Sequence, residues 1–437
     1  AREIQALSEE LARHDIIALD TEFIRETTFF PMVELIQVAT REQSWLIDAA
    51  VFRKRGRQGR EELRPFLDLL ENPKILKILH AAQGDQECFF TAFGALASPS
   101  LDTAVAASLC GYGDSVGLGN LLKSVLNVQL KKGHARTNWA VRPLPAQLLE
   151  YAHSDVEHLV ELAEQLIAQL EKSGRRQWAM DLTAKWEDRR LYESDPEELA
   201  TKLAIGARLD PIGYAALLEL MRWREARVRS LNLPRRWVAD DAVLVDLARV
   251  RPKDMEHLSA FRGLNKGELK NSGESLLEAL RKAEAGGPAT PPPRGPRQEN
   301  PSQGELQVLD LLKCFVGMLA DQHRIAVRHI ATTHQLLDLV RQARVPAPAA
   351  WVEKGILSQF AADLVGAELA ARAGYDPASG VALWQKMMSA NKGAPPEFLS
   401  THPAGNTRIA DIERTLPKVM PLFERAPKPA QRFAPPA

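Results

Sequence analysis

The sequence predicts an α/β domain in the N-terminal part of the chain, followed by domains made of helices. The chain has 437 residues, enough for about three domains at roughly 150 residues each. Its first 85 residues alternate short apolar runs, typical of buried strands, with an amphipathic helical pattern. From Asp102 onward the apolar residues follow the helical period instead.

Four short apolar runs are predicted as strands, and two longer patterns as helices. The strands are expected at residues 16–19, 33–39, 45–49 and 75–80. Residues 61–71 place their apolar side chains on one helical face, where Pro65 fits only in a first turn. Residues 145–172 are predicted as one continuous helical face that begins at Pro145.

Composition excludes several classes of protein. Lys and Arg together number 56, as do Asp and Glu, so the chain is neither a histone-like polycation nor an acidic disordered protein. Its three cysteines, Cys88, Cys110 and Cys314, form no CxxC pair, which favours a reducing compartment over a disulfide framework. No apolar run of about 18 residues predicts a membrane span, and the charged N-terminus has no signal core.

Four acidic residues at the ends of predicted elements indicate a metal site. Asp20 and Glu22 lie two apart on the first strand, so their carboxylates share a face. Asp85 follows the fourth strand, and Asp155 lies one helical turn after Tyr151. Each pattern alone is typical of a solvated face or a cap. Together they suit Mg²⁺ or Mn²⁺, because carboxylates are hard oxygen ligands and would repel one another without cations. Two such ions can clamp a phosphodiester while a phenol orients water.

The sequence around these residues resembles that of bacterial ribonuclease D. Residues 18–39, ALDTEFIRETTFFPMVELIQVA, are similar to its first exonuclease motif, residues 75–87 to the second, and residues 151–156 to the third. Shorter matches occur at residues 101–104, 136–139 and 142–145. The resemblance spans about residues 3–345. It implies a ribonuclease H-like exonuclease fold, a mixed sheet flanked by helices, of the DEDDy branch.

The resemblance also implies residue roles and a reaction. Asp20, Glu22, Asp85 and Asp155 would hold two divalent metal ions, Mg²⁺ or Mn²⁺, and Tyr151 would position the attacking water. The implied reaction is hydrolysis of RNA from a free 3′ end, which releases nucleoside 5′-monophosphates. Precursor tRNA is the substrate expected for the family, and the cytoplasm is the expected compartment.

Basic side chains near these motifs are predicted to contact RNA. Residues 210–285 resemble the all-helical HRDC domain that follows the nuclease in ribonuclease D. The predicted contacts in the two domains are Lys132, Arg136, Arg142, Arg222, Arg224 and Arg227. Phe29 and Phe30 are candidates for stacking on terminal bases, and Trp223 and Trp237 interleave with the arginines of the HRDC-like region. The alternative is that the tryptophans belong to the core and the arginines to a solvated helix face.

The chain is thus expected to contain six segments. They are the exonuclease domain at 1–175, connecting helices at 176–209, the HRDC domain at 210–285, a Pro-rich linker at 286–304, a partial second HRDC-like domain at 305–345, and a remnant at 351–425. The remnant resembles the late part of HExxH zinc metallopeptidases, with Asp363 as the Asp of their ExxxD motif. Gln359 then stands at the ligand position, and HExxH is absent from the chain, so we expect no peptidase activity.

Two alternatives to an exoribonuclease remain open at this stage. DNA 3′→5′ exonucleases share the catalytic scheme, and the sequence does not show whether a 2′-hydroxyl is recognised. A catalytically impaired RNA-binding or scaffold protein is the other alternative.

Overall fold

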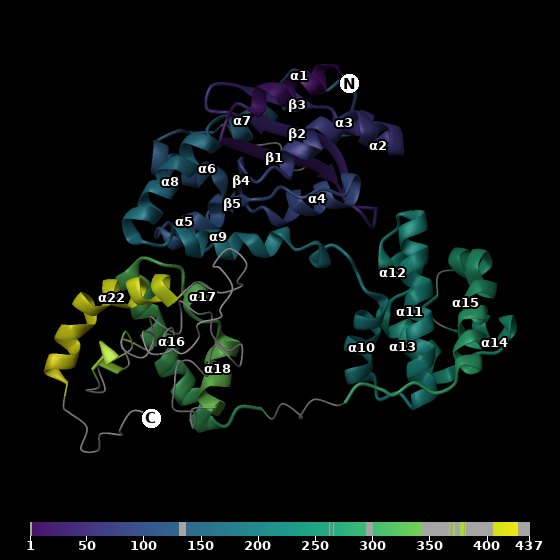
Figure 1. Cartoon of the computed structure of the whole chain (residues 1–437). Coiled ribbons are helices and arrows are strands. Elements are labelled where there is room, and N and C mark those ends of the chain that lie inside the picture. The colour runs from purple at the N-terminus through teal and green to yellow at the C-terminus, as the bar shows by residue number, and fades with distance from the viewer. Residues whose placement is uncertain are drawn as a thin grey trace. The chain divides into compact units, whose positions relative to one another are not determined.

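The computed structural model describes most of the chain in two compact units (Figure 1). The described residues are 2–130, 137–261, 263–264, 266–293, 300–342, 367, 370–371, 376–379, 381 and 405–426. The first unit comprises Ala1–Thr103, Leu126–Glu164 and Met180–Glu299, and the second comprises Ala104–Val125, Gln165–Ala179 and Asn300–Ala437. Among the described residues, no helix is both long enough and apolar enough to cross a membrane.

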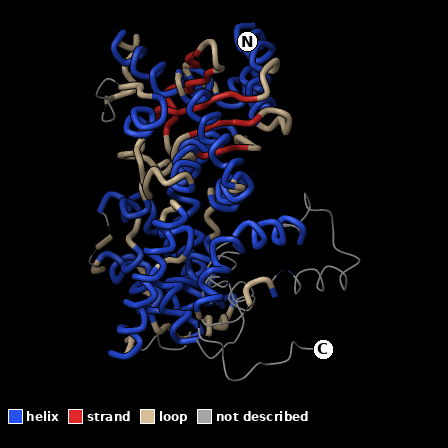
Figure 2. Tube along the Cα trace, turned by 90° about the vertical axis from the view of Figure 1, so that its left-hand side faces the viewer, coloured by secondary structure: helices blue, strands red, loops and turns tan. Residues whose placement is uncertain are grey.

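The first unit contains a mixed five-stranded sheet, which confirms the predicted fold class. Its strands, red in Figure 2, are β1 Ile16–Ile24, β2 Met32–Ala39, β3 Ser44–Ile47, β4 Leu76–Leu79 and β5 Ser100–Asp102. The order across the sheet is β3-β2-β1-β4-β5. β1 pairs with β2, and β2 with β3, in antiparallel fashion, whereas the β1–β4 and β4–β5 pairs are parallel.

The strands differ from the predicted apolar runs at their ends. β1 continues through its acidic residues to Ile24, because its backbone pairs with β2 from Ala18 to Ile24. The run predicted at 45–49 ends as a strand at Ile47, and Ala49 begins helix α2 (Ala49–Lys54). β5 was not predicted, because three residues are too few to show a period.

Helices cover both faces of the sheet. On one face, Leu35 of β2 packs with Trp139, Leu148 and Ala152, the last two from α7 (Ala146–Glu157). The opposite face carries Ile17, Leu19, Ile36 and Val38. These side chains belong to the larger core, which also includes residues of α1 (Arg2–Leu11), α3 (Gly56–Leu70) and α4 (Gln83–Phe93). Alternation along each strand therefore separates the two layers.

Two helix predictions need correction. α3 begins at Gly56, so Pro65 lies inside the helix and not in its first turn. The proline removes one backbone donor, but Leu63, Phe66 and Leu67 bury the same helix against the core. The helix predicted at 145–172 is two helices, α7 and α8 (Leu159–Ser173), separated at His158. Apolar periodicity continues across a one-residue break and does not reveal it.

The predicted helical domain follows within the first unit. The chain reaches it through α9 (Arg176–Ala184), η1 (Lys185–Glu187) and η2 (Arg189–Leu191). Its helices are α10 Pro196–Ala207, α11 Pro211–Leu231, α12 Arg235–Val238, α13 Asp241–Val250, α14 Met255–Ser259 and α15 Lys266–Gly286. All of them except α12 contribute to one core around Leu217, Leu220, Leu247 and Leu280. Asp210 caps α11 by accepting a hydrogen bond from the Gly213 N–H at 2.6 Å.

The described part of the second unit contains helices joined by loops and no strand. It contains α5 Thr103–Leu109 from Ala104 onward, α6 Leu118–Leu126 up to Val125, α16 Gln303–His323, α17 Val327–Ile330, α18 Thr333–Gln342 and α22 Gly405–Arg425. The Ser108 hydroxyl and His329 Nε2 lie 2.6 Å apart and join α5 to α17. Most of the expected remnant at 351–425, including Gln359 and Asp363, lies outside the described residues.

Candidate active site

Three of the predicted site carboxylates converge on one face of the sheet. Asp20 and Glu22 extend from β1 toward α7, and Asp155 extends from α7 itself. Their ligand oxygens all lie within 4.8 Å of one another. The geometry follows from strand alternation and from the packing of α7 against β1, β2 and β3. A single divalent cation fits such a set of hard oxygen ligands.

Asp85 lies beside this group. It occupies the first turn of α4 and is 6% exposed. Its carboxylate accepts a 2.6 Å hydrogen bond from the Thr21 hydroxyl, which comes from the strand residue between Asp20 and Glu22. The structure therefore places three carboxylates together and the fourth next to them, bonded to the same strand.

Burial raises the pKa of all four carboxyl groups, and repulsion by the neighbouring site carboxylates raises it further at Asp20 and Glu22. Burial is the largest cause in each case. It raises the pKa of Glu22 to about 8, that of Asp85 to about 7, and that of Asp155 to about 6. The pKa of Asp20 lies well above its usual range, because the charges of Asp85, Asp155 and Glu22 add to the burial. Divalent cations would offset this repulsion, so the donor set and its charge both fit metal ions.

Tyr151 lies one helical turn before Asp155 and donates a hydrogen bond to its carboxylate. The tyrosine is half-buried, and its ring centroid lies 6.1 Å from that of the buried Trp139. Burial and the nearby carboxylates raise the pKa of the phenol, so it keeps its proton at neutral pH. It is thus fixed as a donor at the edge of the acidic group.

Gln37 is a contact of the site that the sequence did not single out. It stands directly opposite Asp20 in the β1–β2 ladder and is fully buried. Its amide Nε2 donates a 3.3 Å hydrogen bond to Asp20 Oδ2. The register of the two strands would have been needed to find it, and sequence alone does not fix that register.

The predicted RNA contacts of the nuclease domain divide into two groups. Lys132 and Arg136 lie outside the described residues. Arg142 is partly exposed, and its guanidinium forms two 2.8 Å hydrogen bonds with the Asp48 carboxylate. Of the aromatic candidates, Phe29 packs edge-to-face on Phe30, with 4.7 Å between ring centroids.

Arg224 is not a surface contact, which corrects one prediction. It is 2% exposed and pairs with Asp241. Its position one turn after Leu220 and one turn before Val228 places it on the buried side of α11. The guanidinium is therefore structural and cannot reach RNA.

The other HRDC-domain candidates are more accessible. Arg222 is exposed and pairs with Glu197 and Glu219, whereas Arg227 is half-buried. Trp237 is 45% exposed and adjoins the exposed Arg236.

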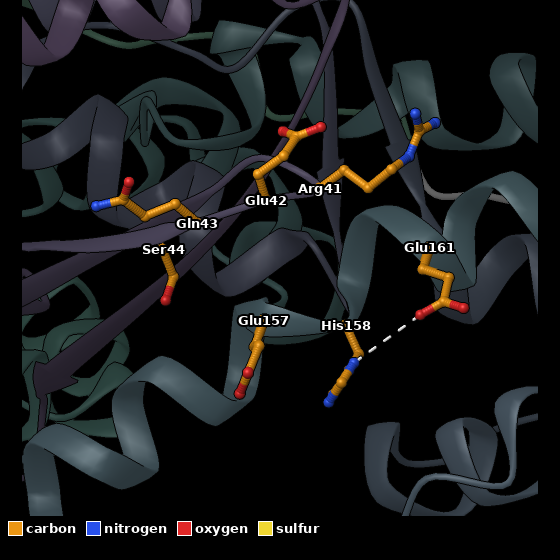
Figure 3. A pocket seen from close by; sticks show the side chains of 7 residues that line it. All are labelled: Arg41, Glu42, Gln43, Ser44, Glu157, His158 and Glu161. Atoms are coloured by element: carbon orange, nitrogen blue, oxygen red, sulfur yellow. Dashed lines mark ion pairs between the residues drawn. The ribbon is translucent and has the colours of Figure 1, made fainter.

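A separate pocket of about 330 Å³ lies between the β2–β3 turn and the α7–α8 junction (Figure 3). Its lining residues are Arg41, Glu42, Gln43, Ser44, Glu157, His158 and Glu161. His158 and Glu161 form a 4.0 Å ion pair there. None of the predicted catalytic residues lines this pocket.

Comparison with known proteins identifies the family. The family model for 3′-5′ exonucleases matches residues 1–171, and the HRDC domain model matches residues 215–280. Ribonuclease D of Bartonella henselae is 35% identical over 345 residues, which cover 78% of this chain and 83% of the relative. The chain belongs to the ribonuclease D family. Ribonuclease D of Granulibacter bethesdensis is 32% identical over 375 residues, 84% of this chain and 92% of the relative.

A solved structure of the ribonuclease D family has the same fold. Escherichia coli RNase D, described as an exoribonuclease involved in structured RNA processing, aligns with a TM-score of 0.65 and 28% identity. The alignment covers 78% of this chain and 88% of that one. Membership of the family, together with the 3′-5′ exonuclease match, makes this chain a 3′→5′ exoribonuclease that acts on RNA.

The C-terminal part also matches a peptidase family. The model for peptidase family M48 matches residues 307–416, in agreement with the resemblance noted in the sequence. This match begins inside the segment 305–345, which is predicted as a partial second HRDC-like domain.

Proposed function

We propose that the chain trims structured RNAs, including precursor tRNA, one nucleotide at a time from the 3′ end, and that two Mg²⁺ or Mn²⁺ ions assist it. The observation that carries this proposal is the group of Asp20, Glu22 and Asp155, whose oxygens lie within 4.8 Å of one another in a ribonuclease D fold. The E. coli relative acts on structured RNA, which supports the substrate class.

The four carboxylates are the proposed metal ligands. Asp20, Glu22 and Asp155 would hold one ion, and Asp85 would complete the site for the second from its place beside them. Bound divalent ions supply charge stabilisation to the phosphodiester and lower the pKa of water. The protein groups keep the site rigid, because Thr21 and Gln37 each fix one of these carboxylates.

Tyr151 is the proposed orienting residue for the attacking water. Its protonated phenol is held by Asp155 at the edge of the acidic group, where it can accept one hydrogen bond from water. Positioning of this kind raises the rate without changing how the metal ligands bind.

The RNA path is proposed to include basic residues of the HRDC domain. The exposed Arg222 and Arg236, the half-buried Arg227 and the accessible ring of Trp237 combine positive charge with a stacking surface, which suits single-stranded RNA. Lys132, Arg136 and Arg142 are proposed to hold phosphates near the 3′ end. We also propose that the chain is divided into the six segments predicted from its sequence and that it acts in the cytoplasm. The segment at 351–425 is proposed to have no peptidase activity.

The test is shortening of a 5′-labelled RNA in Mg²⁺ and in Mn²⁺. Asp155→Asn should abolish shortening while the fold, checked by circular dichroism, is kept. Glu26→Gln, a charge removal at an exposed position four residues after Glu22, is the matched control and should leave activity unchanged. A DNA strand of the same sequence should be degraded much more slowly than the RNA. Full activity of Asp155→Asn would refute the proposed site, and equal rates on RNA and DNA would refute the substrate class.

A further inference from the structure

The turn between β4 and α4 is held by a carboxylate of the neighbouring strand. Asp102, at the end of β5, accepts hydrogen bonds from the backbone N–H groups of Ala81 and Ala82, at 2.9 Å and 3.0 Å. These two residues immediately precede α4, which begins at Gln83. One side chain therefore fixes the last two peptide groups before the helix.

The backbone of this turn needs such support. Ala81 has a φ of 60°, in the left-handed region that residues with a Cβ atom rarely adopt. Glycine would adopt it without a steric cost, but alanine stands there. The Asp102 carboxylate, which bonds the N–H of Ala81 itself, offsets this cost.

Asp102 is itself held in place. It is 3% exposed and pairs with Leu79 in the parallel β4–β5 ladder. Its own N–H donates to the Thr183 hydroxyl at 3.1 Å. The next residue, Thr103, donates to the Leu79 carbonyl at 3.0 Å, so the ends of β4 and β5 are joined by side chains as well as by the ladder.

We infer that Asp102 is a positioning residue for Asp85, an inference that rests on the proposed role of Asp85 as a metal ligand. Asp85 lies in the first turn of α4, three residues after Ala82. A helix is rigid over so short a distance, so the start of α4 determines where this carboxylate points. Asp102 acts through the turn whose N–H groups it holds.

The alternative is that Asp102 has a purely structural role. A residue that holds the other end of β5, Glu187, provides a control for this alternative. Glu187 accepts hydrogen bonds from Ser98 Oγ and from the N–H and Oγ of Ser100, at 2.6, 2.8 and 2.7 Å. It braces the start of β5 as Asp102 braces the turn beyond its end. Glu187→Gln should thus reduce stability without moving Asp85.

The experiment measures Mn²⁺ binding by isothermal titration calorimetry, with the full chain and without RNA. Asp85→Asn should weaken or remove one binding event. Asp102→Asn should weaken the same event about tenfold, the lower end of the usual effect of residues that orient metal ligands. In the Asp85→Asn background, Asp102→Asn should cause no further loss, because the two residues act through one ligand. Glu187→Gln should bind Mn²⁺ like the unaltered chain.

Each outcome decides between the alternatives. Loss in Asp85→Asn with normal binding in Asp102→Asn would overturn the inference and leave the proposed function intact. The inference would also be overturned if Asp102→Asn lowered Mn²⁺ affinity equally in the unaltered chain and in the Asp85→Asn variant. Normal binding in Asp85→Asn would instead refute the proposed role of Asp85. If Asp102→Asn does not fold, Thr183→Val tests the same contacts, because Thr183 holds Asp102. A smaller loss of Mn²⁺ affinity that depends on Asp85 supports the inference, and an unchanged affinity overturns it.

Discussion

Glu22→Gln should make the metal-free protein more stable while it removes metal binding. The carboxyl group of Glu22 lies within 4.8 Å of two others and is largely buried. Burial and the charges of Asp155 and Asp85 raise its pKa from 4.5 to about 8. A glutamine keeps the shape of the side chain and removes the charge. It therefore separates the role of Glu22 in metal binding from the loss of folding stability that its charge causes.

The magnitude follows from the pKa difference between the folded and the unfolded chain. Between pH 4.5 and about 8, the folded state keeps the Glu22 proton and the unfolded state releases it, so the folded state becomes less stable as the pH rises. Each pH unit in this window costs about 1.4 kcal/mol, so at pH 7 the total is roughly 3 kcal/mol. Glutamine has no proton to release, and we therefore expect a gain of about 2–3 kcal/mol in the free energy of unfolding.

Scanning calorimetry of the metal-free proteins checks this magnitude. A gain of that size corresponds to an increase of about 2–4 °C per kcal/mol in the Tm of a domain of 150–250 residues. At pH 4, below both pKa values, the difference between the two proteins should vanish. With Mn²⁺ at 1,000 times its Kd the order should reverse, because only the unaltered site gains binding energy, and binding at that concentration contributes about 4.1 kcal/mol. A loss of stability at pH 7, or a gain that persists at pH 4, would refute the electrostatic reasoning. Glu26→Gln, at an exposed position, should change the Tm at neither pH.

Three further predictions concern pH, the phenol and the HRDC domain. Mn²⁺ affinity should rise from pH 6 to pH 8, because the site carboxyl groups lose their protons as the pH passes their raised pKa values. A calorimetric affinity that does not change over this range would contradict the prediction. Tyr151→Phe should lower kcat about a hundredfold, measured as mononucleotide release, and should leave Mn²⁺ affinity unchanged, since the phenol orients water and is not a ligand. Arg224→Ala should destabilise the HRDC domain by roughly 3 kcal/mol, because it removes a buried side chain and one of the two arginine partners of the buried Glu225. Arg236→Ala should leave the Tm unchanged and reduce the salt dependence of RNA binding by about one unit of slope; the reverse pattern would restore Arg224 as an RNA contact.

The order of the main elements and the grouping of Asp20, Glu22 and Asp155 could be predicted from the sequence, because local pattern located the elements and the resemblance to ribonuclease D singled out the acidic residues. Period-two and helical spacing located β1, β2, β4 and α7, and the spacing of Asp20 and Glu22 gave their common face. Helical spacing also located the helical block at 210–285, and its resemblance to HRDC domains identified it.

What the sequence could not provide depends on contacts between segments distant in the chain. Gln37 meets Asp20 only because β1 and β2 pair in one particular register, and Asp102 meets the α4 turn only because β5 lies beside β4. The burial of Arg224 also depends on tertiary packing. A run of arginines suggests a surface, but which of them is buried depends on which face of α11 packs into the core.

The position of Asp85 follows from the difference in length between β1 and β4. β4 pairs with β1 only over residues 16–18, whereas β1 continues to Ile24. The chain therefore leaves the sheet after Leu79, turns at the peptide groups held by Asp102, and begins α4 beside the part of β1 that β4 does not pair with. Asp85 then reaches Thr21, one residue from each of the strand's two acidic side chains. A longer β4 would occupy this edge of β1 with backbone hydrogen bonds and would move α4 away from the acidic group. The early end of β4 is thus a requirement of the site, and extending β4 by two residues should separate Asp85 from Thr21 and weaken Mn²⁺ binding even if the fold is kept.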